Sequence, residues 1–256
     1  MLEETFVLLN AWDPGMTTAD LMRHTLENGA LGSVTARRHR NIVHEMFHPR
    51  YLSTTPPSTP SAPTNPASAT WLKPLAQDLP RSDFASLALL YTARANEIFH
   101  DFLTEVYWPS YAAGRLDLDT GSAKQFIIRG GEDGHIRPMW SESTVKRVSA
   151  YLLGCCADFG LLEPGRKSSR AITASTLSRS VSLYLAHELH FQGLSDNAVL
   201  QHRDWQLFGL EVSDVLEELK RLVREEHFLL QYSGDLLRIS WKYQRMEEVL
   251  DAVLKR

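Results

Sequence analysis

The stretch Met139–Ala174, MWSESTVKRVSAYLLGCCADFGLLEPGRKSSRAITA, decides how this chain is interpreted. Ser141 is a suitable N-cap, because its hydroxyl can accept a hydrogen bond from a free N–H of the first helical turn, and Gly160 suits a helix end. Between them, apolar side chains recur with helical spacing and share one face: Val145, Val148, Leu152, Cys155, Cys156 and Phe159. We therefore expect an amphipathic helix here.

The opposite face of this helix is basic at its N-terminal end and carries small residues further along. It holds Ser143, Lys146, Arg147, Ala150 and Gly154. This composition would let a bulky partner approach closely. An ordinary solvated helix surface beside a charged loop is the alternative interpretation.

A short hairpin is expected directly after the helix. Leu161-Leu162 begins the first extended segment, Pro164-Gly165 is a turn pair, and Ala171–Thr173 forms the second extended segment. Three basic residues surround the turn: Arg166, Lys167 and Arg170. A groove-binding helix followed by a basic hairpin is the layout of a winged helix.

Positive charge is concentrated in two segments, although the chain of 256 residues has a formal net charge of −4. Residues 33–52 contain four arginines and one glutamate, and residues 137–179 contain seven Lys or Arg and three Asp or Glu. These are the two places where a groove-binding helix is predicted. This distribution is more informative about nucleic-acid binding than the total charge.

The N-terminal part predicts three short helices. The first covers residues 3–12, the second Thr18–Glu27 after a capping box of Thr17 and Asp20, and the third runs from Val34 to about Phe47 with Ser33 as its cap. Arg37, Arg38 and Asn41 lie on the outer face of the third helix. This order is that of a helix-turn-helix unit.

The chain divides into four segments by composition. A Pro/Ser/Thr-rich linker with five prolines is predicted at 53–70, between an N-terminal unit (1–52) and a central unit (71–175). The central unit is predicted to contain a long helix over 82–105, a short helix over 122–129 and an irregular loop after the short helix. A C-terminal unit (176–256) repeats the order of helices, hairpin and final helix. Its helix over 212–227 is acidic, which favours a protein partner over phosphates. The fold class is therefore mainly α, with helix-turn-helix or winged-helix-like units and short β-hairpin wings.

The residues singled out above resemble those of the BrxA family, helical proteins of the BREX anti-phage defence islands. The resembling positions are Leu2–Thr5, Thr17, Glu27-Asn28, Leu31, Ser33, Thr35, Arg37-Arg38, Arg50–Leu52, Phe126-Ile127, Trp140–Thr144, Leu152 and Phe159–Leu162. The resemblance implies a cytoplasmic protein that binds double-stranded DNA without a cofactor. It also implies action beside a methyltransferase, an ATPase and other proteins of the island.

The sequence offers little for catalysis. His187-Glu188-Leu189-His190 resembles part of a zinc hydrolase motif, but its second His follows the first by three residues and no third ligand is evident. Gly130, Gly131 and Gly134 lack the Gly-Lys-Ser/Thr ending of a phosphate-binding loop. The adjacent Cys155 and Cys156 are expected to be reduced packing residues, so neither an enzyme nor a metal site is predicted.

The expected function is therefore non-enzymatic binding of double-stranded DNA in phage defence, mainly through the phosphate backbone. The candidate contacts are Arg37, Arg38, Asn41, Ser143, Lys146, Arg147, Arg166, Lys167 and Arg170. Other BREX proteins would bind the acidic C-terminal unit. No apolar run has the length of a membrane span and the N-terminus lacks a basic signal region, so a cytoplasmic location is expected. The alternatives are a protein–protein scaffold or regulator, and a transcriptional repressor.

Overall fold

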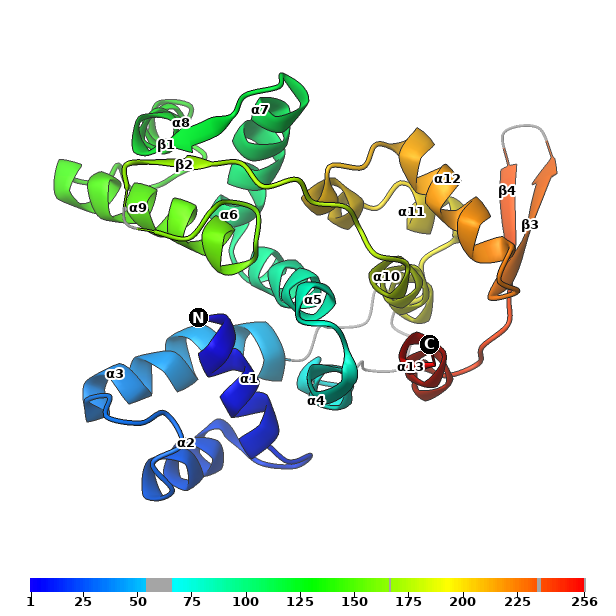
Figure 1. The fold of residues 1–256 in the computed structure, drawn as a ribbon, viewed down its shortest axis with the longest axis horizontal. Coiled ribbons are helices and arrows are strands. Elements are labelled where there is room, and N and C mark those ends of the chain that lie inside the picture. The colour runs from blue at the N-terminus through cyan, green and yellow to red at the C-terminus, as the bar shows by residue number, and fades with distance from the viewer. Residues whose placement is uncertain (54–65, 166, 234–235, 256) are drawn as a thin grey trace.

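The computed structural model describes residues 1–53, 66–165, 167–233 and 236–255, and it is mainly helical with two small antiparallel sheets (Figure 1). The fold class expected from the sequence, mainly α with short β-hairpins, is confirmed. Buried apolar side chains form one continuous cluster that runs from α1 to α13. Within the described residues, no helix has the length and apolar character needed to cross a membrane.

Four helical segments form the N-terminal part: α1 (Leu2–Ala11), α2 (Thr18–Glu27), α3 (Ala36–Arg40) and the π-helical η1 (Asn41–Leu52). The predicted capping box of Thr17 and Asp20 is present, and α2 has the predicted bounds. The third helix starts later than expected, because Thr35, and not Ser33, accepts the backbone N–H of Arg38 at 3.2 Å.

The central part is built from seven helical segments and two strands. They are α4 (Ala69–Asp78), α5 (Arg81–Arg94), α6 (Glu97–Phe102), η2 (Leu103–Tyr107), α7 (Trp108–Ala112), β1 (Asp117–Asp119), α8 (Thr120–Glu132), α9 (Glu142–Asp158) and β2 (Ser169–Ala171). The single long helix expected over 82–105 is wrong. Asn96 has extended backbone and its side chain caps a new helix by accepting the N–H of Phe99 at 3.0 Å, so the chain turns between α5 and α6.

Two further sequence expectations differ from the structure. The helix expected over 122–129 begins at Thr120 and continues to Glu132, through part of the predicted loop. Glycine is accommodated at position 130, whereas any other residue would place its Cβ atom only 2.8 Å from the side chain of Ile136 and would clash with it. Of the predicted linker, residues 54–65 lie outside the described residues, and α4 already begins at Ala69. Ser68 is buried and donates to the carbonyl of Arg50 at 3.1 Å.

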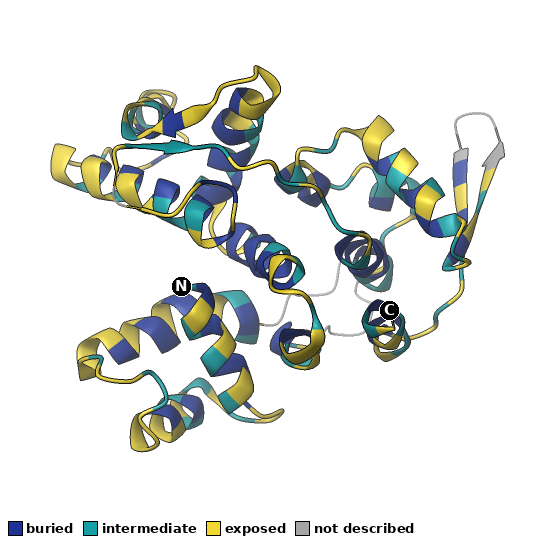
Figure 2. Ribbon diagram, in the orientation of Figure 1, coloured by how far each residue is buried: buried dark blue, intermediate teal, exposed yellow. Residues whose placement is uncertain are grey.

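The C-terminal part contains α10 (Arg179–Phe191), α11 (Asp196–Leu200), η3 (Arg203–Phe208), α12 (Val212–Val223), β3 (Phe228–Ser233), β4 (Leu236–Trp241) and α13 (Met246–Leu254). The predicted hairpin is present, with Phe228 opposite Trp241. Helices α5 and α10 are the most enclosed in the molecule, as their mostly dark blue ribbons in Figure 2 show. They pack against each other and connect the central and C-terminal parts.

Candidate nucleic-acid interface

Helix α9 presents one exposed face because its cap and its apolar stripe orient it. The hydroxyl of Ser141 accepts the backbone N–H of Thr144 at 3.4 Å, as expected for an N-cap. Val145, Leu152 and Cys156 are buried, and both cysteines are free thiols. The predicted stripe faces the core in part, because Val148 and Cys155 are half-buried. Ser149 and Leu153, which the sequence argument did not place inside, are buried as well.

The outward face of α9 carries the basic residues that the sequence indicated. Ser143, Lys146 and Arg147 are exposed, and the Ser143 hydroxyl lies 3.1 Å from that of Ser141. Tyr151, which the sequence argument did not single out, is 62% exposed on the same face. Helical spacing was the available signal, because Tyr151 follows Arg147 by four residues. The face thus combines two cations with an exposed aromatic ring.

The segment after α9 forms the predicted hairpin, and β1 extends it to a third strand. The N–H of Glu163 donates to the carbonyl of Ala171 and that of Thr173 to Leu161, both at 2.9 Å. On the other side β2 pairs with β1, with Leu118 opposite Arg170. The local order is therefore helix, strand, two helices and hairpin, and α9 is the helix directly before the hairpin.

The three basic residues of this hairpin differ in their surroundings. Lys167 is exposed, whereas Arg166 lies outside the described residues. Arg170 is half-buried and turns back toward α9, where its Nη1 donates to the carbonyl of Leu153 at 3.2 Å. A guanidinium bound to the backbone of its own unit supports packing, so we leave Arg170 out of the candidate interface.

The second basic face lies on α3 and the start of η1. Arg37, Arg38 and Asn41 are exposed, and so is Arg40, which the sequence argument had not included. His39 holds the helix against α2 from the inside, with its Nε2 at 2.8 Å from the Thr25 hydroxyl. The helix therefore keeps its arginines on the outside.

The exposed cations of the two basic faces have almost no carboxylate partners. Among the described residues, the structure shows no ion pair for Arg37, Lys146, Arg147 or Lys167, and Arg38 lies 4.0 Å from Glu4. On α12, by contrast, Lys220 pairs with Glu217 at 2.7 Å and Arg221 with Glu218 at 2.9 Å. Unpaired surface cations remain available for an external anion.

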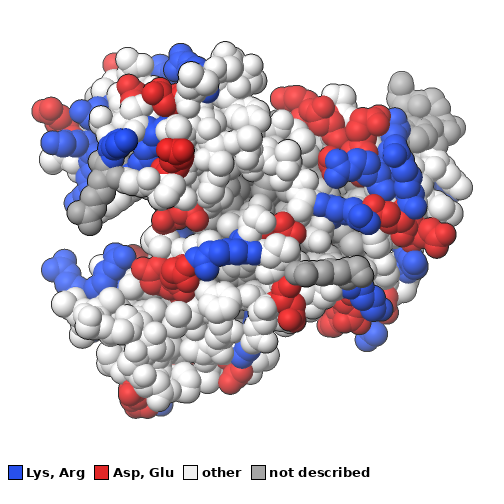
Figure 3. Space-filling model, viewed as in Figure 1, with Lys and Arg blue, Asp and Glu red and all other residues white. Residues whose placement is uncertain are grey.

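The two basic faces lie on opposite walls of a notch. Figure 3 shows this notch at the left of the molecule, between the part containing α9 and the part containing α3, with Lys and Arg side chains on both walls. The closed end of the notch lies where the α-amino group of Met1 is 3.5 Å from the carboxylate of Asp158, the last residue of α9.

The other groups considered for chemistry make contacts within the protein. His187 lies in an aromatic cluster, 4.8 Å from the ring of Trp241, and Glu188 points instead to Arg94. Glu97, His100 and Asp101 bring their ligand atoms within 4.8 Å of one another. Arg203 already binds there, through Nε to His100 at 3.0 Å and through Nη1 to Glu97 at 3.2 Å. Its guanidinium supplies the positive charge that a metal ion would.

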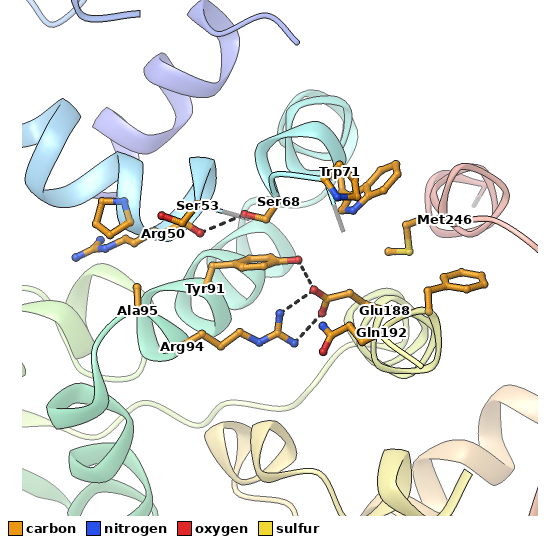
Figure 4. Close-up of a pocket in the computed structure, with 13 residues that line it drawn as sticks. Arg50, Ser53, Ser68, Trp71, Tyr91, Arg94, Ala95, Glu188, Gln192 and Met246 are labelled. Carbon is orange, nitrogen blue, oxygen red and sulfur yellow. Dashed lines mark hydrogen bonds and ion pairs between the residues drawn. The ribbon is translucent and has the colours of Figure 1, made fainter. Parts of the chain in front are cut away.

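A cavity of about 150 Å³ lies between η1, α4, α5, α10 and α13 (Figure 4). Two of its charged lining residues, Arg94 and Glu188, are paired with each other. Glu188 accepts from the Tyr91 hydroxyl at 2.8 Å and from both terminal nitrogens of Arg94. Arg50 also lines the cavity, and its buried Nη1 has no hydrogen-bond partner among the described residues. We assign the cavity no ligand.

Comparison with known proteins supplies one match. The model of a family described as BrxA matches residues 1–188, which include both basic faces and end within α10. No curated protein matches the chain. The acidic helix α12 and the hairpin of β3 and β4 lie beyond the matched residues.

Proposed function

This chain belongs to the BrxA family and is therefore a component of a BREX system, within which we propose that it binds double-stranded DNA without catalysing a reaction. The observation that carries the proposal is the set of exposed cations on α9 and α3, of which, among the described residues, only Arg38 has a carboxylate within 4.0 Å, that of Glu4. DNA phosphates are the abundant partner for such charges, and binding them releases counterions.

The local order around α9 supports the same proposal. We interpret α6–α7, β1, α8, α9 and the hairpin as a winged-helix unit in which α9 enters the major groove and Lys167 lies on the wing. The N-terminus of α9 adds free backbone N–H groups and the positive end of its dipole, which favour a phosphate. Helices α2 and α3 would form the helix-turn-helix counterpart.

Lys146 and Arg147 would contribute mainly to affinity, and Tyr151 would bring an aromatic ring close to the groove. Contacts to phosphate oxygens position a protein on DNA but carry no base information. We therefore propose binding with little sequence preference. The protein would act in the cytoplasm, and its acidic C-terminal part would be left for another protein of the system.

A salt titration tests this function. Log Kd for an unrelated 36-bp duplex should rise steeply with log salt, and Lys146→Ala with Arg147→Ala should lower the slope by roughly 2, since each phosphate contact contributes about 0.9. The matched control is Lys220→Ala with Arg221→Ala, which removes the same two charges from α12, where both are paired. Its slope should equal that of the wild type.

The competing function is a scaffold in which the basic faces meet acidic proteins. It predicts no binding of the wild type to any duplex, even at low salt. Equal slopes for the α9 variant and the α12 control would show that α9 is not the contact.

A further inference from the structure

The walls of the notch are held by one core. On the α3 side, α1 and η1 pack against α5, with the rings of Phe6 and Phe84 centred 6.1 Å apart and those of Tyr51 and Tyr91 6.3 Å apart. The α9 side is attached through Phe159, whose ring lies 6.1 Å from that of Phe99 on α6. Helix α6 packs on α5 in turn. The two walls are therefore not modules that move freely on a tether.

Charge is distributed unequally along the notch. Its open end has Lys and Arg side chains on both walls, and acidic side chains lie nearer the closed end (Figure 3). Glu4 and Asp158 belong to the closed end, where the α-amino group of Met1 lies 2.7 Å from the first and 3.5 Å from the second. Two like-charged walls repel each other until an anion lies between them. The carboxylates of the closed end already have the α-amino group as a cationic partner. This pattern favours an anion that rests between the outer parts of both walls.

We propose that the notch between α3 and α9 clasps a single DNA duplex, so that both basic faces contact the same stretch of it. The inference rests on the proposed DNA binding and adds its geometry. A duplex carries phosphates on every side, about one charge per 1.7 Å of helix axis, so it can satisfy two facing walls at once. Basic faces on opposite sides of a protein would instead need a long or bent DNA.

The clasp makes a specific prediction for short DNA. One turn of the duplex has about 10 base pairs. A 12-bp duplex in the notch meets both walls. If the faces bound separate segments, the same duplex would meet only one face at a time, and either face could substitute for the other.

The test compares salt slopes on the 12-bp duplex for the full chain and two double variants, Arg37→Ala with Arg38→Ala and Lys146→Ala with Arg147→Ala. We expect each double variant to lower the slope by roughly 1 to 2, and all four substitutions together to lower it by the sum. Lys220→Ala with Arg221→Ala is the matched control and leaves the slope unchanged. Thermal melting shows that the variants are folded, which is expected because all the replaced side chains are exposed or on the surface.

Each other outcome has a distinct meaning. Wild-type slopes for both double variants on 12 bp, with reduced slopes on 36 bp, overturn the clasp and leave DNA binding intact. A reduced slope for only one double variant on both duplexes shows that a single wall is the contact, and also overturns the clasp. No binding of the wild type to either duplex removes the proposed function itself.

Discussion

Arg94 and Glu188 form two parallel hydrogen bonds across the contact of α5 and α10, from Nη1 to Oε1 at 2.7 Å and from Nη2 to Oε2 at 2.8 Å. The Nε atom of Arg94 donates to Asp204 of η3 at 2.8 Å. Burial by itself raises the pKa of the Asp204 carboxyl, but the charge of Arg94, assisted by His202, holds it well below its usual range. One guanidinium thus connects three elements of the fold.

Replacing this guanidinium should be strongly destabilising. Arg94→Met leaves the carboxylates of Glu188 and Asp204 enclosed without their cation, so we expect the free energy of unfolding to fall by about 3–5 kcal/mol in urea titrations. The exposed pair of Arg23 and Asp20, at 3.0 Å, provides the control. Arg23→Met should change stability by less than about 1 kcal/mol. Similar losses in the free energy of unfolding for the two variants would mean that the buried network stabilises the fold no more than an exposed ion pair does.

Stability should depend on pH through His187. Burial lowers the pKa of its imidazole to about 4, from an ordinary 6.5, although Nδ1 lies 3.0 Å from the carbonyl of Leu183. Between these values the unfolded chain binds the proton and the folded chain does not. The contribution of the neutral His187 to the free energy of unfolding is therefore fully present above about pH 6.5, and it is lost as the pH falls toward 4.

This contribution can be isolated with His187→Phe, which keeps a ring in the aromatic cluster. The wild type should lose about 2 kcal/mol more than the variant between pH 7 and pH 5, on an order-of-magnitude basis. Denaturant titrations at the two pH values measure it. Parallel losses in both proteins would show that other groups cause the pH dependence.

Gly209 should tolerate no side chain, because it has a φ of +70° and a Cβ there would lie 2.5 Å from the indole of Trp108. That indole is fixed by its Nε1, which donates to the carbonyl of Leu207 at 2.9 Å. Gly209→Ala should therefore cost roughly 3 kcal/mol, from backbone strain and overpacking together. Gly15 also has a positive φ, +94°, but has open space around it. Gly15→Ala should cost only about 1 kcal/mol, and thermal melting of both variants compares them.

Lengthening the segment 53–70 should change little. Ten Gly/Ser residues inserted between Thr59 and Pro60 extend a closed loop, whose entropy varies only with the logarithm of its length, so stability should fall by well under about 1 kcal/mol. The salt slope on a 36-bp duplex should equal that of the wild type, since the core and not this segment sets the positions of the basic faces. A lower affinity that scales with the insert length would instead indicate two tethered units.

The sequence by itself determined the features that depend on neighbours along the chain. The capping box of Thr17 and Asp20, the cap at Ser141, part of the apolar stripe of α9 and the presence of the C-terminal hairpin all follow from hydrogen bonds and periodicities within a few residues. The exposure of Lys146 and Arg147 followed from the same periodicity.

Only the tertiary structure decided which distant groups meet. Arg94 and Glu188 are far apart in the sequence, and nothing local indicates that they pair. Arg170 lies among basic residues in the sequence, yet packing turns it toward the backbone of α9. The break at Asn96 interrupts an apolar stripe that favours a continuous helix. The arrangement of the two basic walls opposite each other is likewise a tertiary feature. The angle between helices is set by how their buried side chains pack across the whole core, so it cannot be predicted from the spacing of residues along one helix.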